Sequence, residues 1–364
     1  IMMLSKTDST LLKGIAIVFV FCHNFLHWIE PLLGENEFFY REEPANNFIN
    51  GLITDPLNSP RYIFIYIAPF VALHLFIFLS GYGLTLSYIN KKVNFKSFII
   101  KRISKLYPVF TIALVGLFFY KYIIFGLEIT NETAIDFLLR YTLIANFIPG
   151  KLFVLNGPFW FYSLIVQLYF CFPVLLFLLK KRVFNIVIVA FIALVLIFLL
   201  NDYLSYQNFS LYSIFIGNLP IFIFGMLYSI HGKAISMHFK WIVPLAIVLF
   251  VLGLYNMYFW YVSYMTFIVI VIALFNVLKK YKAPKYFKQF LLFSGGLSYY
   301  IFAVHGFLRT PWIGFANKAD NDIFHYLYLL VFVVITYVIA MLTREVERFY
   351  FKLVAKYKLR KSNN

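Results

Sequence analysis

Long apolar segments alternate with short polar ones along this chain of 364 residues. Most of the apolar segments approach the roughly 20 residues with which a helix crosses a bilayer. We expect ten spanning helices, and because the boundary around 256–258 is weak, nine or eleven remain as alternatives. The expected spans are 11–29, 61–89, 109–126, 157–179, 184–200, 211–230, 241–255, 259–278, 291–308 and 323–343. The pattern predicts an all-α integral membrane protein, with one transmembrane domain over residues 1–364 and a basic tail at about 344–364.

Composition supports the membrane assignment. Hydrophobic residues make up 62% of the chain and charged residues 13%, which is more apolar surface than a soluble interior can hide. The two cysteines, Cys22 and Cys171, both fall within expected spans. They indicate small hydrophobic core residues rather than a disulfide framework or a metal cluster.

The net charge of +17 reflects orientation in the membrane. With the N-terminus in the cytoplasm and alternating spans, most of the 32 Lys and Arg residues fall on inner segments. Most of the 15 Asp and Glu residues then fall on the outer loops, chiefly 30–60 and 127–156. This asymmetry follows the positive-inside rule and predicts cytoplasmic termini in a multi-pass protein of the cell membrane. We therefore expect membrane lipids as partners and no nucleic acid.

The first expected span, in LLKGIAIVFVFCHNFLHWIE, ends with unusually polar residues. His23, His27 and Glu30 lie on one helical stripe and Asn24 lies beside it. At 1.5 Å per residue, His23 is roughly 18 Å from the cytoplasmic end, past the middle of the membrane. Polar groups at that depth are costly and indicate a functional site, for which proton transfer or substrate contact is the first hypothesis. A histidine hydrogen-bonded between helices and a metal site are the alternatives, although no further ligand motif follows nearby.

A second deep histidine, His305, lies in LSYYIFAVHGFLRTP at a depth similar to that of His23. Ser298 and Arg309 share its helical face. On its own, such a histidine more often packs or hydrogen-bonds within a bundle than takes part in a reaction. Its equal depth with His23 modestly favours a shared site.

Two features of the second expected span indicate packing rather than chemistry. Pro69 should kink the helix near His74. The SGYG stretch at 80–83 is typical of small residues that allow helices to approach closely.

The inner segment NFKSFIIKRISKLYP, residues 94–108, predicts an amphipathic helix at the cytoplasmic interface. Contact with anionic lipid is the simpler role for its basic residues. The alternative is that Lys101, Arg102 and Lys105 bind phosphates of a cytoplasmic ligand.

The fourth expected span begins with aromatic residues typical of a membrane interface, among them Trp160 and Tyr162. Gln167 lies deeper in the same span. A buried amide needs a hydrogen-bonding partner, so we expect one for Gln167.

Five motifs, in order along the chain, resemble the acyltransferase-3 family of integral membrane acyltransferases, which modify bacterial surface glycans. No single motif is specific to this family, but the five motifs in this order, together with ten expected spans, are specific to it. They are LLKGIAIVFVFCH, FIFLSGYGL (76–84), FIIKRISKLYP (98–108), FWFYSLIVQLYFCFP (159–173) and GGLSYYIFAVHGFL (295–308).

The resemblance implies an acyl-CoA donor, such as acetyl-CoA or succinyl-CoA, on the cytoplasmic side. It implies an acceptor hydroxyl on an outer surface polysaccharide or lipid-linked glycan. It further implies that His23 is the catalytic residue and that Lys13 and Arg102 handle the donor. The sequence departs from the family pattern where Lys13 replaces the usual Arg, and where Ile165 and Val166 replace an acidic pair.

Combining residues and resemblance, we expect transfer of an acyl group to an extracytoplasmic hydroxyl, without a metal cofactor. A homodimer remains open. The alternative is an exporter of exopolysaccharide or lipid-linked sugar that performs no acyl transfer. The candidate residues are His23, Asn24 and His305 for catalysis; Lys13, Lys101, Arg102 and Lys105 for acyl-CoA; and His27, Glu30, Trp160, Tyr162 and Gln167 for the acceptor.

Overall fold

The computed structural model describes residues 4–30, 37–41, 43–56, 59–281 and 283–362, and this part of the chain contains helices and loops but no strand. Short 3₁₀ turns and a π-helix, Phe119–Ile124, join some of the α-helices. The α-helices are α1 (Lys6–Leu26), α2 (Glu43–Thr54), α3 (Ser59–Tyr66), α4 (Ala68–Tyr88), α5 (Phe95–Phe118), α6 (Asn131–Tyr141), α7 (Trp160–Lys181), α8 (Val183–Ser205), α9 (Phe215–Met237), α10 (Phe239–Tyr255), α11 (Met257–Leu278), α12 (Lys285–Leu308), α13 (Thr310–Ala316) and α14 (Asp322–Ser362).

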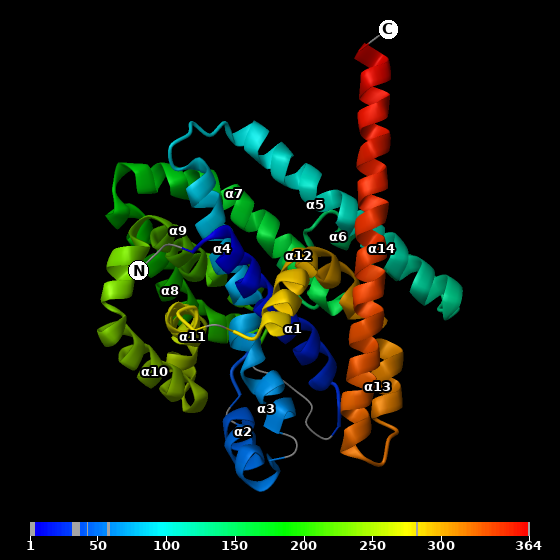
Figure 1. Ribbon diagram of the computed structural model, residues 1–364, viewed down its shortest axis with the longest axis horizontal. Coiled ribbons are helices and arrows are strands. Elements are labelled where there is room, and N and C mark those ends of the chain that lie inside the picture. The colour runs from blue at the N-terminus through cyan, green and yellow to red at the C-terminus, as the bar shows by residue number, and fades with distance from the viewer. Residues whose placement is uncertain (1–3, 31–36, 42, 57–58, 282, 363–364) are drawn as a thin grey trace.

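Among the described residues, nine helices are long and apolar enough to cross a membrane, which confirms an all-α multi-pass membrane protein. They correspond to nine of the ten expected spans. The remaining one is α10, whose 17 residues reach about 25 Å at 1.5 Å per residue. It packs along α11 (Figure 1). With α10 counted, the number of crossings is even, as two termini on the same side require.

Two expected boundaries were wrong. The span expected at 61–89 is broken at Ile67 into α3 and α4, because Pro69 occupies the first turn of α4, where its missing N–H is tolerated. The amphipathic segment 94–108 is not a separate interfacial helix but continues through Pro108 into the third span as α5. The tail after residue 343 continues α14, which extends beyond the rest of the bundle (Figure 1).

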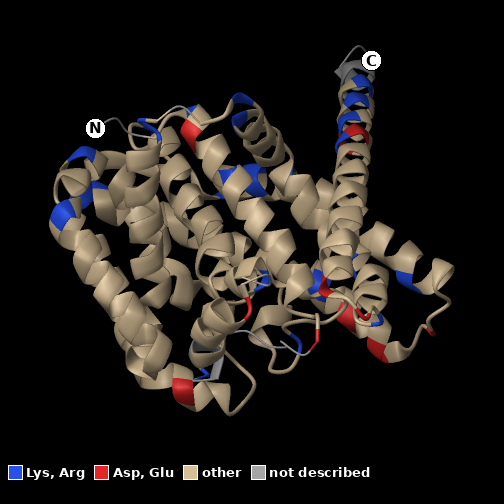
Figure 2. Cartoon of the chain, turned by 60° about the horizontal axis from the view of Figure 1, so that its bottom comes forward, with Lys and Arg blue, Asp and Glu red and all other residues tan. Residues whose placement is uncertain are grey.

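Charged residues separate between the two ends of the bundle. Lys and Arg gather near the start of α1 and the end of α14, whereas most Asp and Glu lie toward the opposite end (Figure 2). By the positive-inside rule we refer to the first end as the cytoplasmic side and to the second as the outer side.

Glycines bring the central helices into close contact. A Cβ atom on Gly14 of α1 would overlap the carbonyl oxygen of Leu291, and one on Gly295 of α12 would overlap that of Thr10. The same reciprocal contact joins α4 and α9 through Gly81 and Gly225, whose Cβ atoms would meet backbone carbonyls of the partner helix. Small residues permit such approach. The packing role expected for the stretch 80–83 is thus confirmed at Gly81.

Candidate active site

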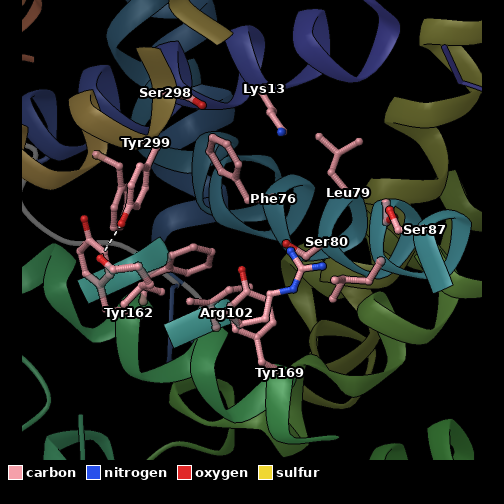
Figure 3. Close-up of a pocket in the computed structure, with 16 residues that line it drawn as sticks. Lys13, Phe76, Leu79, Ser80, Ser87, Arg102, Tyr162, Tyr169, Ser298 and Tyr299 are labelled. Carbon is pink, nitrogen blue, oxygen red and sulfur yellow. Dashed lines mark hydrogen bonds between the residues drawn. The ribbon is translucent and has the colours of Figure 1, made fainter. Parts of the chain in front are cut away.

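A cavity of about 330 Å³ opens among α1, α4, α5, α7 and α12 in the cytoplasmic half of the bundle. Lys13 from α1 and Arg102 from α5 point into it from opposite sides (Figure 3). Ser80, Ser298 and Tyr162 add hydroxyl groups to the wall. The structure therefore brings two cations from distant segments, both singled out from the sequence, to one cavity.

The guanidinium of Arg102 is held by aromatic rings. Its central carbon lies 5.5 Å from the ring centroid of Tyr88, 5.2 Å from that of Phe98 and 5.9 Å from that of Tyr169. Arg102 Nε is buried and has no hydrogen-bonding partner among the described residues. Cation–π contacts orient the guanidinium without occupying its N–H groups, which remain suited to a planar anion such as a phosphate.

A larger groove of about 1,210 Å³ adjoins this cavity between α5 and α14. The two spaces share Arg102, Leu106, Tyr169 and Tyr299, so they adjoin at these side chains. Lys105 lines the groove, whereas Lys101 is exposed and lines neither space. Of the three basic residues expected to act together, Arg102 and Lys105 therefore line the same groove.

A second cavity, of about 580 Å³, lies toward the outer side. Asn24, His27 and Trp160, all singled out from the sequence, line it. The rest of its wall combines aromatic rings with basic groups and residues of the loop before α7. The other lining residues are Trp28, Glu37, Phe38, Phe39, Arg41, Leu73, Lys121, Phe153, Leu155, Asn156, Gly157, Pro158, Phe302, Gly306, Phe307, Arg309 and Thr310.

Arg309 ties the end of α12 to the polar end of α1. Its Nη1 donates to the backbone oxygen and to Oδ1 of Asn24, each at 2.7 Å. Its guanidinium also lies over the ring of Trp28, 5.5 Å from the centroid. Asn24 in turn donates from Nδ2 to the carbonyl of Val20 at 2.9 Å. Asn24 is therefore a fixed part of the cavity wall.

His23 lies one helical turn deeper than His27, and the two rings stack with centroids 4.7 Å apart. His23 Nδ1 is 2.9 Å from the carbonyl oxygen of Phe64, and His27 Nδ1 is 2.6 Å from that of His23. A carbonyl can only accept, so Nδ1 of each ring carries the hydrogen and Nε2 of the neutral ring carries the basic lone pair. His23 is 3% exposed and lies behind His27 rather than in the cavity wall.

His305 is fully buried and lines neither cavity. Its Nδ1 lies 2.9 Å from the carbonyl oxygen of Phe302, within its own helix, and its Nε2 has no partner among the described residues. The structure thus does not bring His305 to the space that Asn24 and Trp160 share. Its catalytic role stays a prediction.

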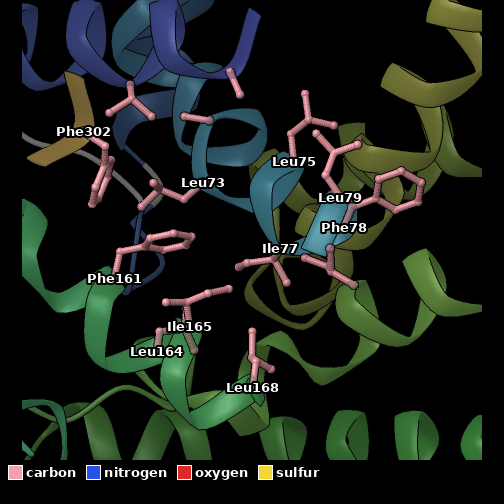
Figure 4. Close-up of a cluster of buried hydrophobic side chains, with 14 of the residues drawn as sticks. Leu73, Leu75, Ile77, Phe78, Leu79, Phe161, Leu164, Ile165, Leu168 and Phe302 are labelled. Carbon is pink, nitrogen blue, oxygen red and sulfur yellow. The ribbon is translucent and has the colours of Figure 1, made fainter. Parts of the chain in front are cut away.

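A thin apolar barrier separates the two cavities. Phe302 lines both of them, Leu73 lines only the outer one and Phe161 only the inner one. All three are buried, and the rings of Phe161 and Phe302 meet edge to face with centroids 5.3 Å apart (Figure 4). At this point one layer of side chains divides the cytoplasmic cavity from the outer one.

Three residues expected at the acceptor lie elsewhere. Glu30 is exposed, and its backbone N–H donates to Asn317 Oδ1 at 3.1 Å. Gln167 lines a lateral apolar groove, where its Oε1 accepts the backbone N–H of Phe215 at 2.9 Å. This bond gives Oε1 a partner, whereas Nε2 is buried and has none among the described residues. Tyr162, expected near the acceptor, lines the cytoplasmic cavity instead.

The sequence did not single out Arg140, which shapes the outer cavity from behind. This buried arginine of α6 donates from Nη2 to Leu152 O at 2.6 Å and from Nη1 to Asn146 Oδ1 at 3.3 Å. Burial lowers the pKa of Arg140 to about 10, although Asp136 opposes the shift, so the group remains charged at neutral pH. The sequence did offer one signal for Arg140, because it is an arginine in an outer segment and few Lys and Arg residues lie on that side.

Comparison with known proteins gives one result. A family model described as an acyltransferase domain matches residues 7–344, nearly the whole chain. Neither the curated proteins nor the solved structures include a match. Among the described residues, no group of three His, Cys, Asp or Glu side chains gathers as a metal site would require. The protein is a membrane acyltransferase, and the chain belongs to the acyltransferase-3 family.

Proposed function

We propose that this protein transfers an acyl group from cytoplasmic acyl-CoA to a hydroxyl group of a polysaccharide or glycolipid on the outer side of the cell membrane. The observation that carries the proposal is the pair of cavities, which approach one another from opposite sides and share Phe302. A reaction whose two substrates come from opposite sides needs such an arrangement.

The cytoplasmic space suits the donor. Its cavity is too small for a whole coenzyme, but the adjoining groove offers a larger volume around Arg102 and Lys105. In this proposal the phosphates bind these two cations and Lys13, since Arg offers a planar pair of donors and Lys a point charge. The acyl-bearing arm then extends toward the apolar barrier at Phe302.

The outer cavity suits a sugar. Trp28 and Trp160 present aromatic faces, which complement the apolar C–H faces of a sugar ring, while Asn24 and His27 supply polar groups. Clefts that combine an apolar lining with a few convergent polar groups are typical of small-molecule sites. We therefore assign the acceptor to this cavity.

His23 is the proposed general base. Its Nε2 removes the proton of the acceptor hydroxyl, whose oxygen attacks the thioester carbonyl and forms the ester as the C–S bond breaks. The imidazolium then returns its proton to the departing CoA thiolate, so that the ring ends neutral. Because His23 lies behind His27, side chains at the barrier must shift before the acceptor reaches it.

Binding of acyl-CoA tests the proposal. We expect acetyl-CoA or succinyl-CoA to raise the unfolding temperature of the purified protein in lipid nanodiscs, since a ligand that binds only the folded state stabilises it. Dephospho-CoA, which lacks one phosphate, should stabilise it less. Absence of stabilisation by either acyl-CoA would contradict the proposal and favour an exporter.

A further inference from the structure

The outer cavity is basic on a side of the protein that is otherwise acidic. Few Lys and Arg residues lie on the outer side, where Asp and Glu predominate (Figure 2). Three of these basic residues, Arg41, Lys121 and Arg309, nevertheless line this one cavity, where Glu37 is the acidic member of the described lining. A uniform scatter of charges would not place them together.

Three further outer cations have different roles. Arg61 and Arg140 donate to backbone carbonyls, and Lys151 forms ion pairs of 2.8 Å with Glu132 and with Asp136. Arg61, Arg140 and Lys151 therefore support the fold elsewhere, whereas Arg41, Lys121 and Arg309 line the cavity.

Lys121 is positioned by an irregular piece of backbone. It lies in the π-helix Phe119–Ile124 at the outer end of α5, a conformation that is rare and frequent at functional sites. Its Nζ donates to the carbonyl oxygen of Leu155 at 2.6 Å, and none of the ion pairs among the described residues includes it. An ammonium group has three donors. One carbonyl contact leaves capacity for an anionic partner.

Asn156 adds a donor to the same wall. Its side chain is 6% exposed, and its Nδ2 has no hydrogen-bonding partner among the described residues. Gly306 makes room for this side chain, because a Cβ atom there would overlap the amide of Asn156. A buried N–H without a partner is costly, so a ligand oxygen is the natural complement.

We propose that the outer cavity selects an acceptor glycan that carries an anionic oxygen group, a phosphate or a carboxylate, close to the hydroxyl that is acylated. This inference rests on the proposed function, because it names the class of acceptor for the same site. The donors of Lys121, Arg309 and Asn156 converge on the aromatic cavity and complement an acceptor rich in oxygen and negative charge. A neutral glycan would offer these cations no negative charge.

The test compares sugars that differ in charge. The purified full chain in phosphatidylcholine nanodiscs is titrated with glucose, glucuronate and glucose 6-phosphate, and binding is followed by tryptophan fluorescence, because Trp28 and Trp160 line the cavity. We expect at least one anionic sugar to bind about tenfold more tightly than glucose at low salt, as a charge-assisted hydrogen bond implies. Preference for glucuronate alone identifies a carboxylate, and preference for glucose 6-phosphate alone identifies a phosphate.

Matched variants locate the effect. Lys121→Gln and Arg41→Gln should each reduce the preference for the anion by about threefold or more, whereas Lys121→Arg should retain it. Lys318→Gln removes an exposed outer lysine that does not line the cavity and should leave the preference unchanged. Should Lys121→Gln fail to fold, Arg41→Gln decides the matter, because Arg41 is exposed.

Two results overturn the inference: equal affinity for glucose and both anionic sugars, or a loss in Lys318→Gln as large as in the cavity variants. Stabilisation by acyl-CoA is measured on the same samples. If acyl-CoA stabilises the protein but the anion preference is absent, only the acceptor class is wrong. If acyl-CoA does not stabilise it, the proposed function fails.

Discussion

Replacing Arg102 should weaken acyl-CoA binding more than any other single change on the cytoplasmic side. Rings of Tyr88, Phe98 and Tyr169 hold its guanidinium within 5.9 Å of their centroids, so the side chain is already oriented. A hydrogen bond to a charged partner contributes about 1.5–3 kcal/mol. Arg102→Ala should therefore raise the Kd for acyl-CoA roughly 10- to 150-fold. Arg102→Lys keeps the charge but loses the planar donors, so its Kd for acyl-CoA should lie between those of the wild type and Arg102→Ala.

The assay is a titration of acyl-CoA into the purified protein in neutral nanodiscs, with Lys96→Ala as the matched control. Lys96 is an exposed lysine of the same helix and lines none of the cavities described above. Its replacement should change the Kd less than about twofold, since an exposed charge contributes little. Equal losses in Arg102→Ala and Lys96→Ala would refute the reasoning, because the effect would then reflect net charge and not the oriented guanidinium.

Three further predictions concern stability. Gly295→Ala should lower the unfolding temperature, at a cost of about 1–3 kcal/mol, because its Cβ would overlap a carbonyl of α1. A Cβ atom on Gly296 would meet open space, so Gly296→Ala should leave the unfolding temperature unchanged. An equal loss of stability in the two variants would exclude steric overlap as the cause. Arg140→Met should destabilise the protein by about 1–3 kcal/mol in denaturant titrations, by leaving backbone carbonyls without their donor; an unchanged midpoint would contradict this. The hydrogen bond from Lys151 lowers the pKa of Glu132 in the folded protein. The pair therefore stabilises α6 at pH values above the pKa that Glu132 has in the unfolded chain, and this stabilisation is lost as the pH falls through the lower pKa of the folded state. The protection factors of the α6 amides, which correct the exchange rates for the intrinsic effect of pH, should then fall in acid. In Glu132→Gln they should not change across that pH range.

Much of the fold could be predicted because apolar length is a local signal. Nine long spans follow from runs of hydrophobic residues, and the charge asymmetry supplies the orientation. The errors arose where the chain departs from one helix per apolar run. Pro69 breaks a helix instead of kinking it, and α5 passes through Pro108 without stopping. Tertiary packing decides both outcomes.

The site was predictable only in part. Lys13 was expected at the donor only from the family resemblance, and Arg102 also from the basic segment 94–108; the structure brings both to one cavity. Tyr162 was expected at the acceptor but lines the cytoplasmic cavity, because position along a helix does not tell which cavity a side chain faces. Asn156 and Lys121 could not be found, since their roles depend on a loop and a π-helix folding against α12.

The measurement that tests the central claim most directly is the mass of the surface polysaccharide in cells that express the wild-type protein, His23→Gln, or neither. We predict that the wild type adds the mass of one acyl group per modified residue. Cells with His23→Gln at equal abundance in the membrane should match cells without the protein. An unchanged acyl content with His23→Gln would contradict the proposed role of His23, and a polysaccharide of equal mass with and without the wild-type protein would contradict acyl transfer itself.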